Sequence, residues 1–94
     1  MLFVHLTIHK PKKDKTGALT DSMHRFGDAL QGQPGLQQVY TLKDPNTGCL
    51  MGLAIWDSHD DYVAARPAMD EAVKDDNFAE WEEEPPTVYH LELA

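Results

Sequence analysis

The chain has 94 residues, a formal net charge of −8 and a hydrophobic share of 41%. A chain of this length forms one domain, here residues 1–94, with a modest core. The negative charge argues against binding to nucleic acid or to an anionic membrane surface. No apolar stretch approaches the ~20 residues of a membrane span. Residues 1–8 have no basic region before their apolar side chains, so we expect no signal peptide.

Cys49 is the only cysteine, which excludes a disulfide within the chain. A single free thiol fits a reducing compartment, so we expect a cytoplasmic protein. Without a catalytic partner nearby in the sequence, Cys49 is predicted to be a small buried apolar residue.

Side-chain character alternates over residues 2–9, which predicts a β-strand. One face of this strand, at positions 2, 4, 6 and 8, is wholly aliphatic. The opposite face mixes an aromatic ring with polar groups and consists of Phe3, His5, Thr7 and His9. A basic turn containing Pro11 closes the strand.

Residues 16–31 are predicted to form a helix, because their large apolar residues fall on one helical face. These residues are Leu19, Met23, Phe26 and Leu30. Gly32 suits the position after the helix end, and Pro34 prevents continuation. His24 and Arg25 lie away from the apolar face and are expected to meet water.

Two further strands, at residues 36–43 and 49–56, are predicted to form a hairpin around the turn-forming residues 44–48. The second strand is almost continuously apolar, which is typical of a strand covered on both faces. Ser58 and Asp61 then resemble a capping box at a helix start. We expect a short helix over residues 60–65 that stops before Pro67, and a second helix that contains Met69.

The acidic run at residues 70–84 is most simply a solvated surface, and residues 87–93 are predicted to form the last strand. The order is therefore β-α-β-β-α-β. This is an α+β, ferredoxin-like arrangement in which two helices cover one face of a four-stranded antiparallel sheet.

An uncovered apolar sheet face implies a partner, and a second copy of the chain, packed sheet against sheet, is the simplest. Residues 49–56 are apolar on both sides, yet the helices can cover only one. We expect the first strand's face with Phe3, His5, Thr7 and His9 to meet the partner, and its aliphatic face to pack against the helices.

Several features resemble the antibiotic biosynthesis monooxygenase domain family of the dimeric α/β-barrel superfamily. They are the first strand ending in Lys10-Pro11, Pro34-Gly35 before the second strand, and Ile55-Trp56-Asp57-Ser58 followed by Tyr62. The resemblance covers nearly the whole chain and implies a dimeric α/β barrel. The family includes quinol and polyketide oxygenases, haem-degrading enzymes and proteins of unknown role, so the fold alone does not set the activity.

The resemblance implies an oxygenase without metal or flavin, because a deprotonated phenolic substrate can itself donate an electron to O₂. Such a site needs an apolar pocket, hydrogen-bond donors and a proton acceptor. Trp56 and Tyr62 match the family's aromatic positions and offer an N–H and an O–H, although large aromatics in such positions are more often core residues. The expected pocket between sheet and helices is lined by Met23, Phe26, Trp56, Tyr62 and Met69.

Two branches of the family fit this sequence poorly. Where polyketide-oxidising members have an Asn and an Arg, this chain has Gly52 and the mostly acidic segment 74–77. Where haem-degrading members have Asn, Trp and His, it has Val4, Ala65 and Asp75.

The five histidines do not predict a metal site. His5 and His9 would lie ~13 Å apart on a strand, too far to share an ion. His90 could meet His5 if the first and last strands pair, but no third ligand is evident. His5 and His90 are instead the best candidates for a proton acceptor, given the pKa of histidine.

Two functions remain open. One is a cofactor-independent monooxygenase acting on a small aromatic or quinol-type molecule. The other is a non-catalytic dimeric module that binds a small apolar ligand or regulates a neighbour.

Overall fold

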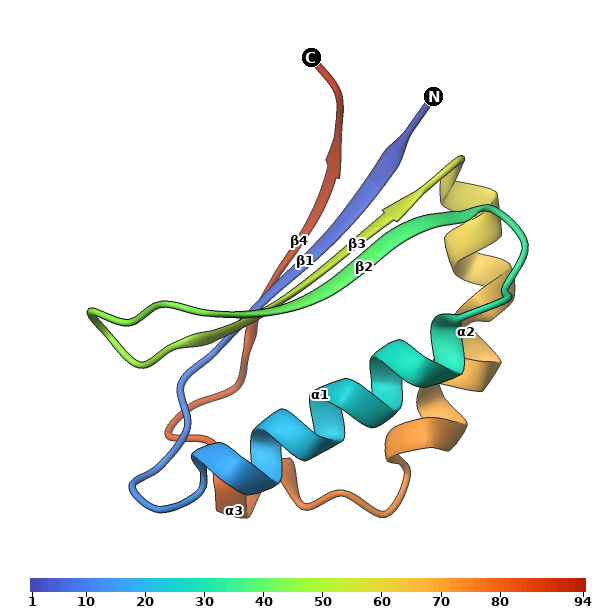
Figure 1. Ribbon diagram of the computed structural model, residues 1–94. Coiled ribbons are helices and arrows are strands. Elements are labelled where there is room, and N and C mark those ends of the chain that lie inside the picture. Colours follow the sequence, from blue (N-terminus) through green and yellow to red (C-terminus); the bar gives the residue numbers. More distant parts are fainter.

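The computed structural model describes residues 1–94 and contains one antiparallel sheet with helices on one side (Figure 1). The elements are β1 (Phe3–His9), α1 (Thr16–Leu30), β2 (Leu36–Lys43), β3 (Leu50–Trp56), α2 (His59–Val73), α3 (Phe78–Trp81) and β4 (Thr87–Glu92). The strand order β2-β3-β1-β4 is ferredoxin-like, which confirms the predicted fold class. None of the helices is both long and apolar enough to cross a lipid bilayer.

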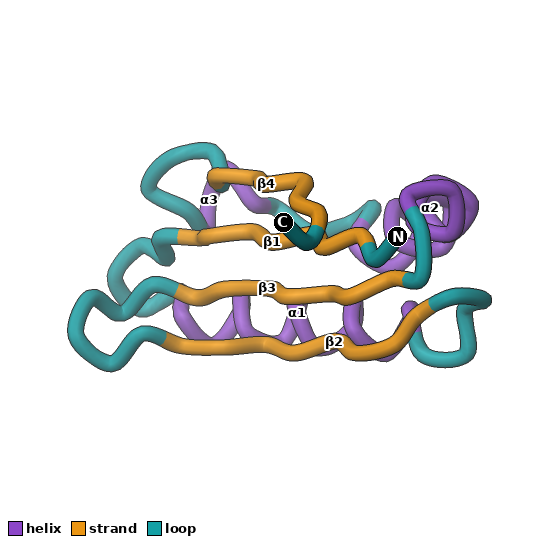
Figure 2. Tube along the Cα trace, turned by 90° about the horizontal axis from the view of Figure 1, so that it is seen from above, coloured by secondary structure: helices purple, strands orange, loops and turns teal.

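Helix α1 packs on the sheet through the predicted face. Leu19, Met23 and Leu30 are buried, and Phe26 is half-buried against the core. His24 and Arg25 are exposed, as expected. Figure 2 shows α1 behind β2 and β3, while the opposite side of the sheet has no covering element.

Helix α2 is continuous, so the predicted break before Pro67 is wrong. Pro67 removes the hydrogen bond that its N–H would make to the carbonyl of Val63. Pro67 and Val63 are both on the exposed side of the helix, where water can satisfy that carbonyl. On the other side Tyr62, Ala65 and Met69 are all buried in one cluster, and this packing holds the helix together across the proline.

The predicted sides of β1 are reversed. Phe3 is packed in the core with Leu30 and Tyr62, and the His5 ring lies 4.9 Å from the ring of Tyr62, so this face meets the helices. The aliphatic face is the uncovered one. Strand register places ten apolar residues on it, which we call the open face: Val4, Leu6, Ile8, Tyr40, Leu42, Met51, Leu53, Ile55, Tyr89 and Leu91.

The register explains the reversal. Thr7 pairs with Gly52 and His5 pairs with Ala54 in β3. These small residues leave space between sheet and helices, and the polar side chains of β1 find partners there. The aliphatic side chains of β1 face the bulky Met51, Leu53 and Ile55 across the strand pair, which gives the open face its continuous apolar character.

The acidic segment near the C-terminus is only partly a solvated surface. Asp76 accepts hydrogen bonds from Ser22 and Arg25, and Glu82 is buried with only 5% of its surface exposed. Within this segment the short helix α3 turns Phe78 and Trp81 toward Leu19 and the start of α1. Cys49 is half-buried, short of the full burial expected from the sequence.

Candidate functional site

A cavity of about 260 Å³ lies between the helix-facing side of the sheet and helix α1. Met23 and Phe26 of α1 form one wall, as predicted, and Val39 and Ala54 of the sheet contribute to the other. The polar groups of the lining include His5, Thr7 and His9, all from β1. An apolar cavity with a few convergent polar groups is the usual form of a small-molecule site.

Tyr62 and His90 lie next to His5, which lines one end of this cavity, but neither of them is part of the lining. The imidazole of His5 lies in the lining, 4.9 Å from the ring of Tyr62 and 5.3 Å from the ring of His90. The Tyr62 hydroxyl is 3.4 Å from Nε2 of His90, a long contact for a hydrogen bond. The antiparallel pairing of β1 with β4 sets His5 opposite His90, as anticipated.

The pKa of His5 is lowered to about 4, mainly by burial and then by electrostatic interactions with His90, Arg66 and His9, which disfavour its charged form. His5 is therefore neutral at physiological pH, with an imidazole nitrogen free to accept a proton or hydrogen bond. A bound anion would offset the neighbouring positive charges and raise the pKa of His5 again.

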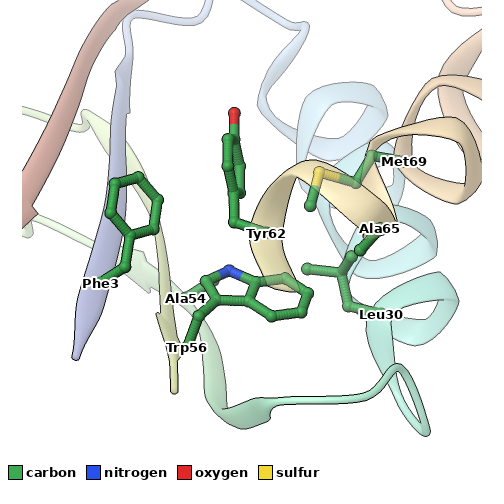
Figure 3. Packing of buried hydrophobic residues seen from close by; sticks show 7 residues of the cluster. All are labelled: Phe3, Leu30, Ala54, Trp56, Tyr62, Ala65 and Met69. Carbon is green, nitrogen blue, oxygen red and sulfur yellow. The ribbon is translucent and has the colours of Figure 1, made fainter. Parts of the chain in front are cut away.

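Trp56, Tyr62 and Met69 were also expected in the lining, but all three belong to the core cluster shown in Figure 3 and none lines the cavity. The Trp56 side chain is 0% exposed, and its Nε1–H has no hydrogen-bond partner. Its indole stands edge-on to Tyr62, with ring centroids 6.3 Å apart at 72°. Figure 3 shows the indole nitrogen on the side toward the Tyr62 ring, while the Tyr62 hydroxyl points away. Such N–H to ring contacts are weakly favourable.

The start of α2 positions Tyr62. Ser58 caps this helix, accepting a hydrogen bond from the Asp61 N–H at 3.2 Å and donating one to its carboxylate at 3.0 Å. The sequence predicted this cap correctly. Gly35, with φ of +85°, lies against Asp61, and its carbonyl accepts from the Asp57 N–H at 2.7 Å. A side chain at position 35 would be strained and would collide with Asp61.

At the His9 end of the lining, three polar side chains form a chain of hydrogen bonds. His9 Nδ1 is 2.5 Å from the Glu82 carboxylate, and His9 Nε2 is 2.9 Å from Thr7 Oγ1. Sequence reasoning missed this group, because 73 residues separate His9 from Glu82 and an acidic run is usually solvated. The sequence indicates only that Thr7 and His9 lie on the same strand face as His5.

The charged side chains of the segment after α2 are engaged within the chain. Lys74 pairs with Glu71 at 2.7 Å. Asp76 accepts hydrogen bonds from two residues of α1, from Arg25 at 2.7 Å and from Ser22 at 2.5 Å. No group of three histidine, cysteine or carboxylate side chains is arranged to hold a metal ion.

No family model matches the sequence, and no curated protein matches it. Solved structures do match in fold. Rv0793 from Mycobacterium tuberculosis aligns with a TM-score of 0.87 at 14% identity, over 100% of this chain and 96% of that one. Two proteins provisionally named antibiotic biosynthesis monooxygenases also align. The one from Nitrosomonas europaea has a TM-score of 0.79 at 17% identity, over 96% of this chain and 88% of that one.

The second, from Bordetella bronchiseptica, has a TM-score of 0.76 at 15% identity, over 99% of this chain and 97% of the other. Identities this low establish the fold and leave activity open. The chain thus shares its ferredoxin-like fold with structures that bear the name antibiotic biosynthesis monooxygenase, which confirms the family resemblance at the level of the fold.

Proposed function

We propose that this protein is a cofactor-independent monooxygenase that acts on a small aromatic or quinol-type molecule. The observation that supports this most is the neutral His5 in the wall of an apolar cavity, beside Tyr62 and His90. The single free cysteine is consistent with work in the reducing cytoplasm.

In the proposed reaction His5 accepts the proton of a substrate hydroxyl. The substrate becomes a negatively charged phenolate and His5 becomes a positively charged imidazolium, so the net charge of the site does not change. The phenolate then donates an electron to O₂. The Tyr62 hydroxyl, which lies 3.4 Å from Nε2 of His90, is the group that we propose donates a hydrogen bond to the phenolate oxygen.

The low pKa of His5 is compatible with this role. Burial and nearby positive charge disfavour the imidazolium in the empty cavity. A phenolate formed beside it supplies the missing negative charge, and charges separated by a few ångströms interact strongly in a site with little water. Proton transfer and anion binding therefore assist each other.

We also propose that the active form is a homodimer joined through the open face. That face presents apolar residues from all four strands, and its edge residues Leu42 and Leu91 are 43% and 42% exposed. Contiguous apolar surface of this extent is unusual on a monomer. A second copy would cover it by sheet-to-sheet packing.

A second candidate is a non-catalytic dimeric module that binds a small apolar ligand or regulates a neighbour. It is favoured by Gly52 and by the segment at 74–77, where Asp76 and Lys74 are already engaged within the chain. Such a module would bind a ligand in the same cavity without consuming oxygen.

Matched variants separate the two candidates. His5→Gln keeps a polar side chain of similar size but removes the base, and Tyr62→Phe removes only the hydroxyl. An oxygenase should lose at least tenfold in kcat in either variant with little change in melting temperature. His24→Gln, on the exposed side of α1, is the control. Equal oxygen uptake by wild type and His5→Gln would contradict the proposed role of His5.

A further inference from the structure

We propose that Thr7, His9 and Glu82 form a second proton-accepting site, which binds a ligand hydroxyl at the part of the cavity away from Tyr62. This inference uses the same cavity as the proposed function, but it assigns a different group of residues. Thr7 and His9 line the cavity, and Glu82 supports His9 from outside the lining.

Hydrogen-bond chemistry gives the direction of this relay when the ring of His9 is neutral. The Glu82 carboxylate can only accept, so Nδ1 of His9 bears the hydrogen of their 2.5 Å contact. In the neutral ring Nε2 is then an acceptor, and it takes the hydroxyl hydrogen of Thr7 at 2.9 Å. The remaining lone pairs of Thr7 Oγ1 are left to accept a hydrogen bond from a ligand in the cavity.

The relay can move one proton with all atoms balanced. A ligand O–H gives its proton to Thr7 Oγ1, while Thr7 gives its own to Nε2 of His9. The ligand becomes an oxyanion, Thr7 is unchanged, and His9 becomes an imidazolium paired with Glu82. No electron changes hands, and no co-reactant is needed.

The contact between His9 and Glu82 is buried. The side chains of His9 and Glu82 are only 12% and 3% exposed. A buried carboxylate is costly unless it is paired. Yet the backbone already joins these segments, because Glu83 N–H bonds Lys10 at 2.9 Å and Lys12 N–H bonds the Trp81 carbonyl at 2.8 Å. The contact between His9 and Glu82 is therefore not required to place Glu82.

Gly52 supports the assignment independently. A Cβ at this position would lie 2.9 Å from Thr7 Oγ1 and 3.5 Å from the end of Met23. Any larger residue would displace the Thr7 hydroxyl. Glycine at position 52 therefore leaves the Thr7 hydroxyl in place. Polyketide-oxidising members of the resembled family are expected to have Asn at this position.

A nucleophilic role for Thr7 is disfavoured by the sheet. β1 is an inner strand, paired with β3 on one side and β4 on the other, so its backbone N–H groups are used in the ladders. Acyl transfer needs free N–H donors to hold an oxyanion. The other titratable side chain that faces the cavity is His5, at the Tyr62 end, because the side chain of Tyr40 lies on the open face.

The test uses 4-nitrophenol, whose phenolate is coloured and whose electron-poor ring does not reduce O₂. In the His5→Gln protein, which lacks the first proton acceptor, the bound probe should still ionise at least tenfold more than free probe at the same pH. Adding Thr7→Val, which keeps the branched shape but removes the hydroxyl, should abolish this gain. Gly52→Ala in the same background should reduce it by moving Thr7, even if Thr7→Val fails to fold.

The absorbance of bound probe distinguishes this relay from a structural pair. If His9 and Glu82 were structural only, Glu82→Gln would lower the melting temperature without changing ionisation of the probe. The relay would be overturned if the probe did not ionise in His5→Gln, or if its ionisation survived both Thr7→Val and Gly52→Ala. Failure of the wild type to bind the probe would also overturn it. A lack of oxygen uptake with every quinol would count against the oxygenase and leave the relay intact.

Discussion

A charge on the open face should separate the proposed dimer. Leu6 lies at its centre, opposite Leu53 on β3 and Tyr89 on β4. An obligate sheet-to-sheet interface buries about 2,000 Å² or more in total, so each copy would bury about 1,000 Å², roughly a sixth of the 5874 Å² that one chain exposes. In Leu6→Asp each copy would bury an unpaired carboxylate, which costs on the order of 3 kcal/mol or more.

That cost corresponds to roughly a hundredfold weaker association for each copy that bears the charge. Light scattering coupled to size exclusion should show a dimer for the wild type and a folded monomer for Leu6→Asp. Leu91→Asp, where the parent side chain is already 42% exposed in a single chain, tests the same face with little risk to folding. His24→Asp, on the exposed side of α1, should remain dimeric. A monomeric mass for the wild type at micromolar concentration would refute the reasoning.

Three further predictions concern stability. Leu30 is 0% exposed, so Leu30→Ala should lower the free energy of unfolding by about 2–5 kcal/mol. A decrease below about 0.5 kcal/mol, measured by denaturant unfolding, would contradict the assignment of Leu30 to the core. Ser58→Ala removes the cap of α2 and should cost about 1 kcal/mol in the same assay, whereas Ser58→Asp should largely retain the cap. The pKa of His5 is about 4 when folded and 6.5 when unperturbed, so the unfolded chain binds more protons between those values. The free energy of unfolding should therefore be unaffected by His5 above pH 6.5 and should fall as the pH drops toward 4, by about 1–3 kcal/mol after allowance for solvent screening. His5→Gln should remove this part of the pH dependence.

Periodicity and turn chemistry predicted the fold well because local signals agreed along the chain. The alternation in β1, the apolar face of α1 and the cap at Ser58 all depend on neighbours within a few residues. The continuity of α2 could not be predicted in this way. It depends on the burial of Tyr62, Ala65 and Met69 on a common face, which outweighs the local effect of Pro67.

Which face of β1 meets the helices also depends on tertiary structure. An aliphatic face suits either a core or a partner, and the choice follows from the small Gly52 and Ala54 opposite Thr7 and His5. The cavity wall from Met23 and Phe26 was predictable from the helix face. The pairing of His9 with Glu82 was not, since it joins the two ends of the chain.

Oxygen uptake by metal-stripped protein tests the central claim most directly. Wild-type protein should consume O₂ with at least one member of a panel of para-quinols and anthrones, and added metal ions or flavin should not increase the rate. Binding of a quinol in the cavity without any oxygen consumption, with or without added metal or flavin, would contradict the oxygenase and favour the ligand-binding module.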